Sequence, residues 1–223
     1  MNYFTVNINV ISGASSFTFV SGNIYEHQTN GTNIGLANVP VQSCLSYEPA
    51  YNPSGQGMVG LAMTPTGDGY WQTSPNGYVY SFGDAGYYGS MGGVSLNAPI
   101  VGIVATPDGK GYWLVGADGG IFNFGDAGFY GSMGGKALNA PVVGMAATPD
   151  GKGYWLVGAD GGIFTFGDAV FYGSMGGSTL SAPVVGMAAT PSGKGYWLVG
   201  ADGGIFNFGD FIYSSFTSGS KLN

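Results

Sequence analysis

Arginine is absent from this 223-residue sequence, and charged residues of all kinds make up only 8% of it. The five lysines begin at Lys110, and the formal net charge is −7. Contacts to nucleic-acid phosphates and to anionic lipid head groups need clustered Lys or Arg. The scarcity of basic residues therefore argues against a nucleic-acid-binding protein and against attachment to an anionic membrane surface.

Cysteine and histidine each occur once, as Cys44 and His27. A single cysteine cannot form an internal disulfide, so no disulfide framework supports the fold. His27 lies in a stretch that we interpret as a polar loop, where a lone histidine is most often a surface residue. Because nothing suggests a Ser–His–Asp order or a pair of acids outside the repeats, we expect no enzyme activity and no cofactor.

Long apolar runs are also absent. A helix that crosses a bilayer needs roughly 18 or more apolar residues in succession, and the sequence has no such run. The opening MNYFTVNINVISG alternates between polar and apolar residues and lacks the basic start of a secretory signal. We expect no membrane insertion and no signal peptide, with Met1 starting the chain.

Glycine and aromatic residues are abundant by contrast. Glycine occurs 44 times and aromatic residues make up 15% of the chain. Aromatic and β-branched residues interrupted by glycine favour many short strands joined by tight turns. The composition predicts an all-β fold.

One motif fills most of the chain. GYWLVGADGGIFNFGD at 111–126 returns almost unchanged at 153–168 and 195–210, and a looser version occupies 69–84. The period is 42 residues, which is typical of solenoids and propellers. One tryptophan recurs in each repeat, and we predict these four as the structural core: Trp71, Trp113, Trp155 and Trp197.

Turn signals divide each repeat into four expected strands. The third repeat gives strands at 142–149, 154–159, 163–166 and 171–175, separated by DGKG, DGG and GDA turns. Four antiparallel strands per repeat are typical of a propeller blade. We predict four blade-like repeats in a propeller-like array, with two tandem β-sandwich or jelly-roll domains as the alternative. The repeats span 57–98, 99–140, 141–182 and 183–223.

Residues 1–56 differ from the repeats and predict a small β region with strands at 4–11, 16–27 and 36–47. The segment SGNIYEHQTNGTNIGLANVPVQ resembles the opening of small Ig-like or carboxypeptidase-regulatory β-sandwiches. A region this short buries little core by itself. We therefore expect it to act as an anchor, packed on the repeats or on another subunit.

Aspartates recur in two turns of the repeat, DGG and FGD. Calcium requires six or more converging oxygens, whereas each turn offers one carboxylate. We expect each aspartate to cap its own turn, and we predict no metal site. The DGG aspartates are Asp118, Asp160 and Asp202, and the FGD aspartates are Asp84, Asp126, Asp168 and Asp210.

Two further patterns concern sugars. Lys110, Lys152 and Lys194 recur in the DGKG turns, which read SGKG in the last repeat, and are the candidate glycan contacts of the repeats. Asn30 begins the triplet Asn-Gly-Thr, which matches a glycosylation acceptor and applies only in a host that glycosylates the protein.

The stretch PVVGMAATPDGKGYWLVGADGGIFTFGDAVFYGS resembles tandem repeats of secreted and surface proteins of bacteria and archaea. That resemblance covers 57–210 and implies extracellular display on a propeller-like array. The overall character, with no arginine and many polar uncharged strands, is similar to turret (vertex-spike) proteins of acidophilic archaeal icosahedral viruses.

These observations favour a non-enzymatic structural and display protein, most concretely a virion turret or spike exposed outside the capsid. The expected partners are copies of itself and other capsid or vertex proteins, and the expected location is the virion surface. The alternative is a lectin-like propeller that binds host-surface glycans. Because few carboxylates are available to titrate, we also expect the fold to suit an acidic medium.

Overall fold

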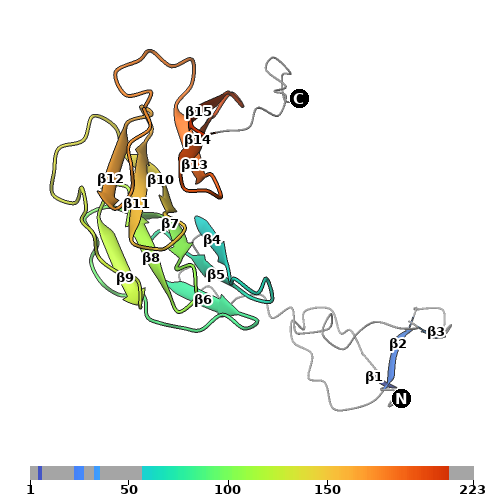
Figure 1. Cartoon of the computed structure of the whole chain (residues 1–223). Helices are drawn as coiled ribbons and strands as arrows, with labels where there is room; N and C mark the ends of the chain where they lie inside the picture. Colours follow the sequence, from blue (N-terminus) through green and yellow to red (C-terminus); the bar gives the residue numbers. More distant parts are fainter. Residues whose placement is uncertain (1–4, 7–22, 28–32, 36–56, 211–223) are drawn as a thin grey trace. The chain divides into compact units, whose positions relative to one another are not determined.

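The computed structural model describes residues 5–6, 23–27, 33–35 and 57–210 (Figure 1). The chain divides into two units, Met1–Gly55 and Gln56–Asn223. In the first unit, strand β1 (Thr5–Val6) pairs parallel to β2 (Asn23–His27), which pairs antiparallel to β3 (Asn33–Gly35). His27 pairs with Asn33, so its backbone belongs to the end of a strand, as the expected strand at 16–27 implies, and not to a polar loop. The strand expected at 36–47, Cys44 and Asn30 lie outside the described residues.

The second unit consists of four antiparallel sheets of three strands each, one sheet per repeat. Apolar and aromatic residues on both faces form the strands, as in the GYWLVG segments at 111–116 and 153–158, which are buried at all six positions. The glycine-containing turns predicted from the sequence connect the strands. The first two sheets contain β4 (Gly60–Met63), β5 (Tyr70–Thr73), β6 (Val79–Phe82), β7 (Ile100–Ala105), β8 (Gly111–Gly116) and β9 (Ile121–Gly125). The last two contain β10 (Val142–Ala147), β11 (Gly153–Gly158), β12 (Ile163–Gly167), β13 (Val184–Ala189), β14 (Gly195–Gly200) and β15 (Ile205–Gly209).

The prediction of an all-β chain with tandem repeated sheets is confirmed, but the predicted number of strands per repeat is wrong. Residues 171–175 form no strand. Gly173 has a φ of 134°, which interrupts an extended backbone. The N–H of Tyr172 donates to the hydroxyl of Tyr196 in the next repeat (3.1 Å) and not to a neighbouring strand. The segment after the third strand therefore links repeats and does not widen the sheet.

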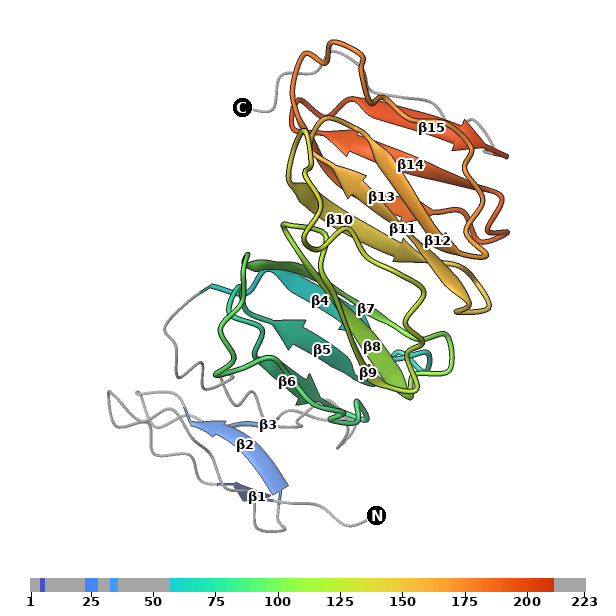
Figure 2. The same cartoon turned by 90° about the vertical axis from the view of Figure 1, so that its left-hand side faces the viewer.

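The four sheets follow one another in sequence order, and their first strands lie side by side (Figure 2). Strand β4 neighbours β7, β7 neighbours β10, and β10 neighbours β13. No contact joins β4 to β13 within residues 57–210, so the array that the structure describes is an open series of sheets. This arrangement differs from the two jelly-roll sandwiches that the sequence left as an alternative.

The hydrophobic core lies between consecutive sheets. Three clusters fill the three spaces, each combining a tryptophan from one repeat with a tyrosine and a leucine from the next. Trp71, Trp113 and Trp155 are fully buried, whereas Trp197 in the last repeat is only partly buried. Stability therefore depends on the junctions between repeats, as expected for an array whose units cannot bury both faces alone.

Candidate interaction surfaces: repeat junctions, turns and outer loops

Each junction is built around an aromatic pair. In the third junction, the ring centroids of Trp155 and Tyr196 are 5.8 Å apart. The Tyr196 hydroxyl donates to the carbonyl of Gly173 at 2.6 Å and accepts from the N–H of Tyr172. The Tyr172 hydroxyl in turn donates to the carbonyl of Gly193 at 3.2 Å. Two tyrosines thus satisfy backbone groups of the opposite repeat in both directions.

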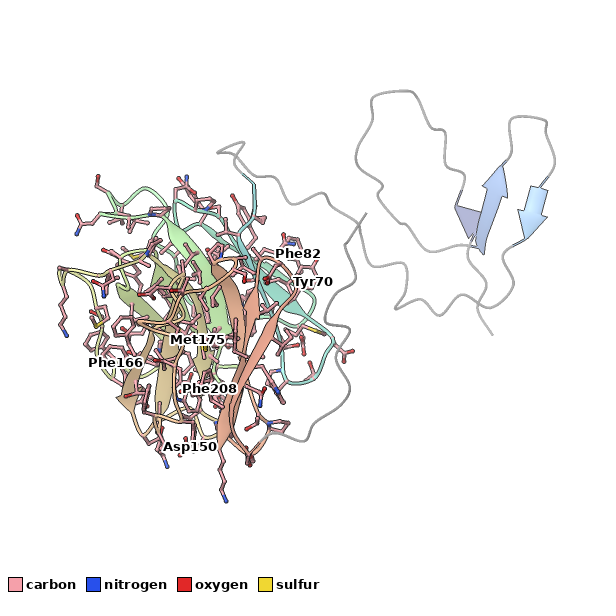
Figure 3. The ribbon with its side chains drawn as sticks, turned by 90° about the horizontal axis from the view of Figure 1, so that it is seen from above. Tyr70, Phe82, Asp150, Phe166, Met175 and Phe208 are labelled. Atoms are coloured by element: carbon pink, nitrogen blue, oxygen red, sulfur yellow. The ribbon has the colours of Figure 1, made fainter. Side chains whose placement is uncertain are left out.

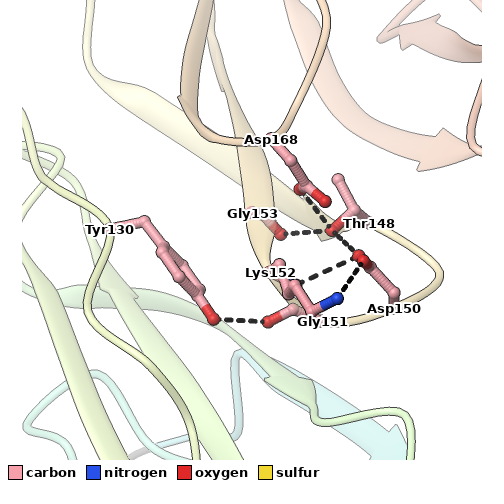
Figure 4. Close-up of polar contacts among 7 residues, drawn as sticks. All are labelled: Tyr130, Thr148, Asp150, Gly151, Lys152, Gly153 and Asp168. Carbon is pink, nitrogen blue, oxygen red and sulfur yellow. Dashed lines mark hydrogen bonds and ion pairs between the residues drawn. The ribbon is translucent and has the colours of Figure 1, made fainter.

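The other two junctions repeat this geometry. Their tryptophan–tyrosine ring distances are 5.7 Å for Trp71–Tyr112 and 5.9 Å for Trp113–Tyr154. The Tyr130 hydroxyl donates to the carbonyl of Gly151 at 3.0 Å, as Figure 4 shows. A partner for each buried hydroxyl removes the penalty of burying an unpaired polar group.

Burial changes the acidity of the junction tyrosines. Loss of solvent around its hydroxyl raises the pKa of Tyr112 to about 12, because burial disfavours the charged phenolate. The same cause raises the pKa of Tyr154 and of Tyr196. These hydroxyls are therefore neutral donors over the ordinary pH range, and they serve the fold.

The turn after each first strand carries a polar network (Figure 4). In the third repeat, the Thr148 hydroxyl lies within hydrogen-bond distance of Asp150 (3.1 Å), Asp168 (3.0 Å) and the carbonyl of Gly153 (3.2 Å). Asp150 also accepts from the Lys152 N–H at 3.2 Å. That backbone hydrogen bond, with smaller contributions from the Lys152 ammonium and other groups, lowers the pKa of Asp150 to about 2.

The two classes of turn aspartate behave differently. The DGG aspartates cap their own turns as predicted, since Asp160 accepts from the N–H of Gly162 at 2.9 Å. The expectation is wrong for three of the FGD aspartates, Asp84, Asp168 and Asp210, which accept from threonine hydroxyls of an earlier turn, as in Thr64–Asp84 (2.8 Å). They therefore fasten the end of the third strand to the end of the first. No group of three or more His, Cys, Asp or Glu residues in the described ranges is arranged to hold a metal ion.

The lysines proposed as glycan contacts lie in separate turns. Lys110 and Lys152 each form an ion pair of 3.2 Å with the aspartate two residues earlier, and each lysine side chain is 72% exposed. Lys194 follows Ser192, so it lacks this aspartate. Its N–H donates to the Ser192 hydroxyl at 3.1 Å. Glycan contact at these lysines stays a prediction.

An exposed aromatic residue that was not predicted from the sequence lies in the segment that links repeats. Tyr87, Phe129 and Phe171 are 62%, 58% and 56% exposed and occupy the same position in successive repeats. The signal was present as the first ring of the pairs YY, FY and FY. The second ring of each pair, as in Tyr172, reaches the next repeat, whereas the first faces solvent.

A groove of about 350 Å³ lies beside the first of these linking segments. Two asparagine amides are its polar side chains, and it contains no charged group. Its lining residues are Pro75, Asn76, Val94, Leu96, Asn97, Ala98 and Pro99. With so few polar groups converging, the groove offers shape and apolar contact but no chemistry for a reaction.

Comparison with known proteins shows which fold the repeats resemble. No family model matches the chain, and no curated protein matches it. Among solved structures, the β-propeller domain of Cps50 (Swd1) from Myceliophteria thermophila aligns with a TM-score of 0.50 at 12% identity. The match covers 69% of this chain and 52% of that domain, so the chain spans about half the length of the propeller. At this identity the likeness concerns the fold alone: the repeats are arranged as in a β-propeller.

No helix in the described ranges has the length and apolar character needed to cross a membrane.

Proposed function

We propose that the protein is a non-enzymatic structural and display protein, in which the repeats form a scaffold for the outward-facing segments between them. The observation that carries this proposal is the use of the recurrent polar groups. The tyrosine hydroxyls bind backbone carbonyls across junctions, and threonines and aspartates bind one another between two turns of the same repeat. Because these polar side chains are hydrogen-bonded to other groups of the repeats, their role is to stabilise the fold of the scaffold.

The most concrete setting is the surface of a virion, as a turret or spike component associated with copies of itself and with other vertex proteins. Support comes from the low charge, the absence of arginine and the resemblance of the repeats to microbial surface proteins. The exposed aromatic residues Tyr87, Phe129 and Phe171 support the display role, because they place an exposed ring at the same position in each of the first three repeats.

The display role is tested on particles purified from the organism or virus that encodes the sequence. An antibody raised against residues 168–178 is expected to label intact particles, and limited proteolysis of intact particles is expected to remove the label. An antibody against residues 154–157, which are fully buried, is the matched control and should bind only after denaturation. Absence of the protein from particles, or labelling only after disruption, would reject the proposal.

The second candidate is a glycan-binding propeller, and the exposed aromatic residues favour it. An exposed ring offers a flat apolar face on which the C–H side of a sugar can stack, and regular spacing permits several weak contacts at once. A glycan array probed with the wild type and with Phe129→Ala/Phe171→Ala tests this reading. Lys110→Ala/Lys152→Ala/Lys194→Ala separates the ring contacts from the predicted lysine contacts. Absence of any glycan signal from the wild type would reject this candidate.

A further inference from the structure

Within residues 57–210, the first and last sheets of the array each have one face that no other sheet of the array covers. On the first sheet this face, the head face, consists of Leu61, Met63 and Tyr70. Leu61 and Met63 are 57% and 60% exposed, whereas Ile103, at the position of Leu61 in the second repeat, is 5% exposed. Tyr70 stacks on Phe82 with centroids 4.8 Å apart, and Figure 3 shows the pair together at this end of the array.

The last sheet exposes the opposite face, the tail face, which consists of Val185, Ala188, Trp197 and Val199. Val185 is 52% exposed, Ala188 is exposed, and Trp197 and Val199 are partly exposed. At the matching positions of the third repeat, Ala146 is 9% exposed, and Trp155 and Val157 are fully buried. The residue types are the same, so the difference in exposure reflects the absence of a covering sheet within residues 57–210.

The head and tail faces are the two halves of the junction that already occurs three times within the chain. Tyr70 occupies the position of Tyr112, Tyr154 and Tyr196, which cover the tryptophan of the preceding repeat. The turn next to Tyr70 is likewise not packed against another repeat of the described array. A Cβ on Gly67 would meet nothing within 4 Å, whereas one on Gly109 would lie 2.6 Å from Pro65 of the preceding repeat. Within residues 57–210, no repeat therefore precedes the head face and none follows the tail face.

We propose that the tail face of one copy of this chain binds the head face of a second copy, so that two copies close one ring of eight sheets. Contacts between two different faces of identical chains close into a ring when the rotation permits. The open series of four sheets spans 52% of a propeller domain, and closed propellers typically have about four to eight blades. This inference names the partner of the proposed structural protein, and it rests on that proposal for the role of the repeats as a scaffold.

One residue distinguishes this contact from the internal junctions. Gln72, which pairs with Leu61 in the first sheet, stands where Leu114, Leu156 and Leu198 stand in the later repeats. An amide at this position weakens apolar packing, so the contact between copies is weaker than an internal junction and separates first. The polar residue also limits how strongly single chains associate through this face in other ways.

The solution mass of the full-length chain, measured by light scattering over a concentration series, tests the inference. The wild type is expected to form a dimer. Met63→Lys on the head face and Val185→Lys on the tail face are each expected to weaken association by about 30-fold or more, because each places a charge in an apolar contact. Val94→Lys, at a side chain that is 53% exposed on neither face, is the matched control and should remain dimeric.

Mixing the two disrupted variants provides the sharper result. A head-to-tail contact predicts that Met63→Lys and Val185→Lys recover a dimer together, since one junction then joins two unchanged faces. A wild-type monomer at every concentration would overturn the inference. So would a Met63→Lys variant that stays dimeric, because a contact between two tail faces would survive that change.

The outcome is separable from that of the display proposal. A dimer that is never found on particles would leave the head-to-tail contact standing and reject the display role. A monomeric protein that is accessible on particles would do the reverse.

Discussion

Trp155 and Trp197 occupy the same position in consecutive repeats, within the same sequence YWLV, yet only Trp155 is fully buried. The difference comes from the neighbour on the C-terminal side of each repeat. Tyr196 covers Trp155, whereas no described repeat comes after the sheet that carries Trp197. The comparison teaches that, in this array, the contribution of a side chain to stability is set by its neighbouring repeat as much as by its own.

The largest expected effect comes from replacing the two tryptophans of this comparison by alanine. Trp155→Ala removes a fully buried ring and the hydrogen bond from its indole N–H to the carbonyl of Val170 (2.8 Å). We expect it to lower the free energy of unfolding by about 3–5 kcal/mol. Trp197→Ala should cost less than about 2 kcal/mol, because less of its surface is buried. Urea denaturation in dilute solution, where single chains predominate, measures both, and equal losses would contradict the comparison.

A backbone change inside a junction is expected to have the next largest effect. A Cβ on Gly173 would lie 2.5 Å from the ring of Phe208, at a φ that side chains rarely adopt. Gly173→Ala should therefore destabilise the fold by about 2–3 kcal/mol. Gly177→Ala is the control, because Gly177 also has a positive φ (82°) but nothing within 4 Å. Thermal unfolding should show a clearly smaller loss for the control, and equal losses would assign the whole effect to backbone strain.

Removing one hydroxyl sharpens the comparison between a covered tyrosine and an exposed one. Tyr196→Phe leaves the N–H of Tyr172 and the carbonyl of Gly173 without this partner, which costs about 1–3 kcal/mol. Tyr70→Phe at the head face should change the free energy of unfolding by less than about 0.5 kcal/mol in dilute solution. Chemical denaturation of both variants is the measurement. A loss at Tyr70 as large as that at Tyr196 would indicate that the head face is covered within a single chain.

The smallest expected effect concerns the turn aspartates at low pH. The pKa of Asp108 and of Asp150 is lowered to about 2, first by the backbone N–H of the lysine two residues later. Their contribution to stability is therefore present above the unfolded value near 3.8 and is lost as the pH falls toward 2. Asp108→Ser/Asp150→Ser copies the fourth repeat, which has Ser192 there. The melting temperature of this variant should fall less than that of the wild type between pH 4 and pH 2, and parallel curves would contradict the assignment.

The raised pKa values of the junction tyrosines act at the opposite end of the pH scale. A group whose folded-state pKa lies above its unfolded value stabilises the fold below the unfolded value and ceases to do so as the pH rises. For Tyr112 this window runs from 10 to about 12. The junctions are therefore expected to weaken in strong alkali, and near-ultraviolet absorbance would record phenolate formation together with unfolding.

The sequence predicted the features that depend on local spacing. The period of 42 residues located all four sheets, and the DGG and DGKG turns separated their strands. The prediction of a fourth strand is wrong because FYGSM has the composition of a strand, whereas its conformation is decided by a contact with the next repeat. In that contact the N–H of Tyr172 donates to the hydroxyl of Tyr196. The role of the FGD aspartates failed for a similar reason, since their threonine partners lie 18–20 residues away. Contacts between residues that are distant along the chain, whether across a junction or within one repeat, leave no mark in the local sequence pattern.

The hydrogen bonds of every junction connect residues at fixed separations of 21, 23 and 24 positions along the chain. A tandem duplication of one 42-residue unit therefore creates one complete new junction, with every donor and acceptor already matched. The two end faces remain unchanged whatever the number of units between them. Unequal recombination can thus lengthen or shorten the array in a single genetic event, and the near identity of residues 99–140 and 141–182 is the trace that such an event leaves.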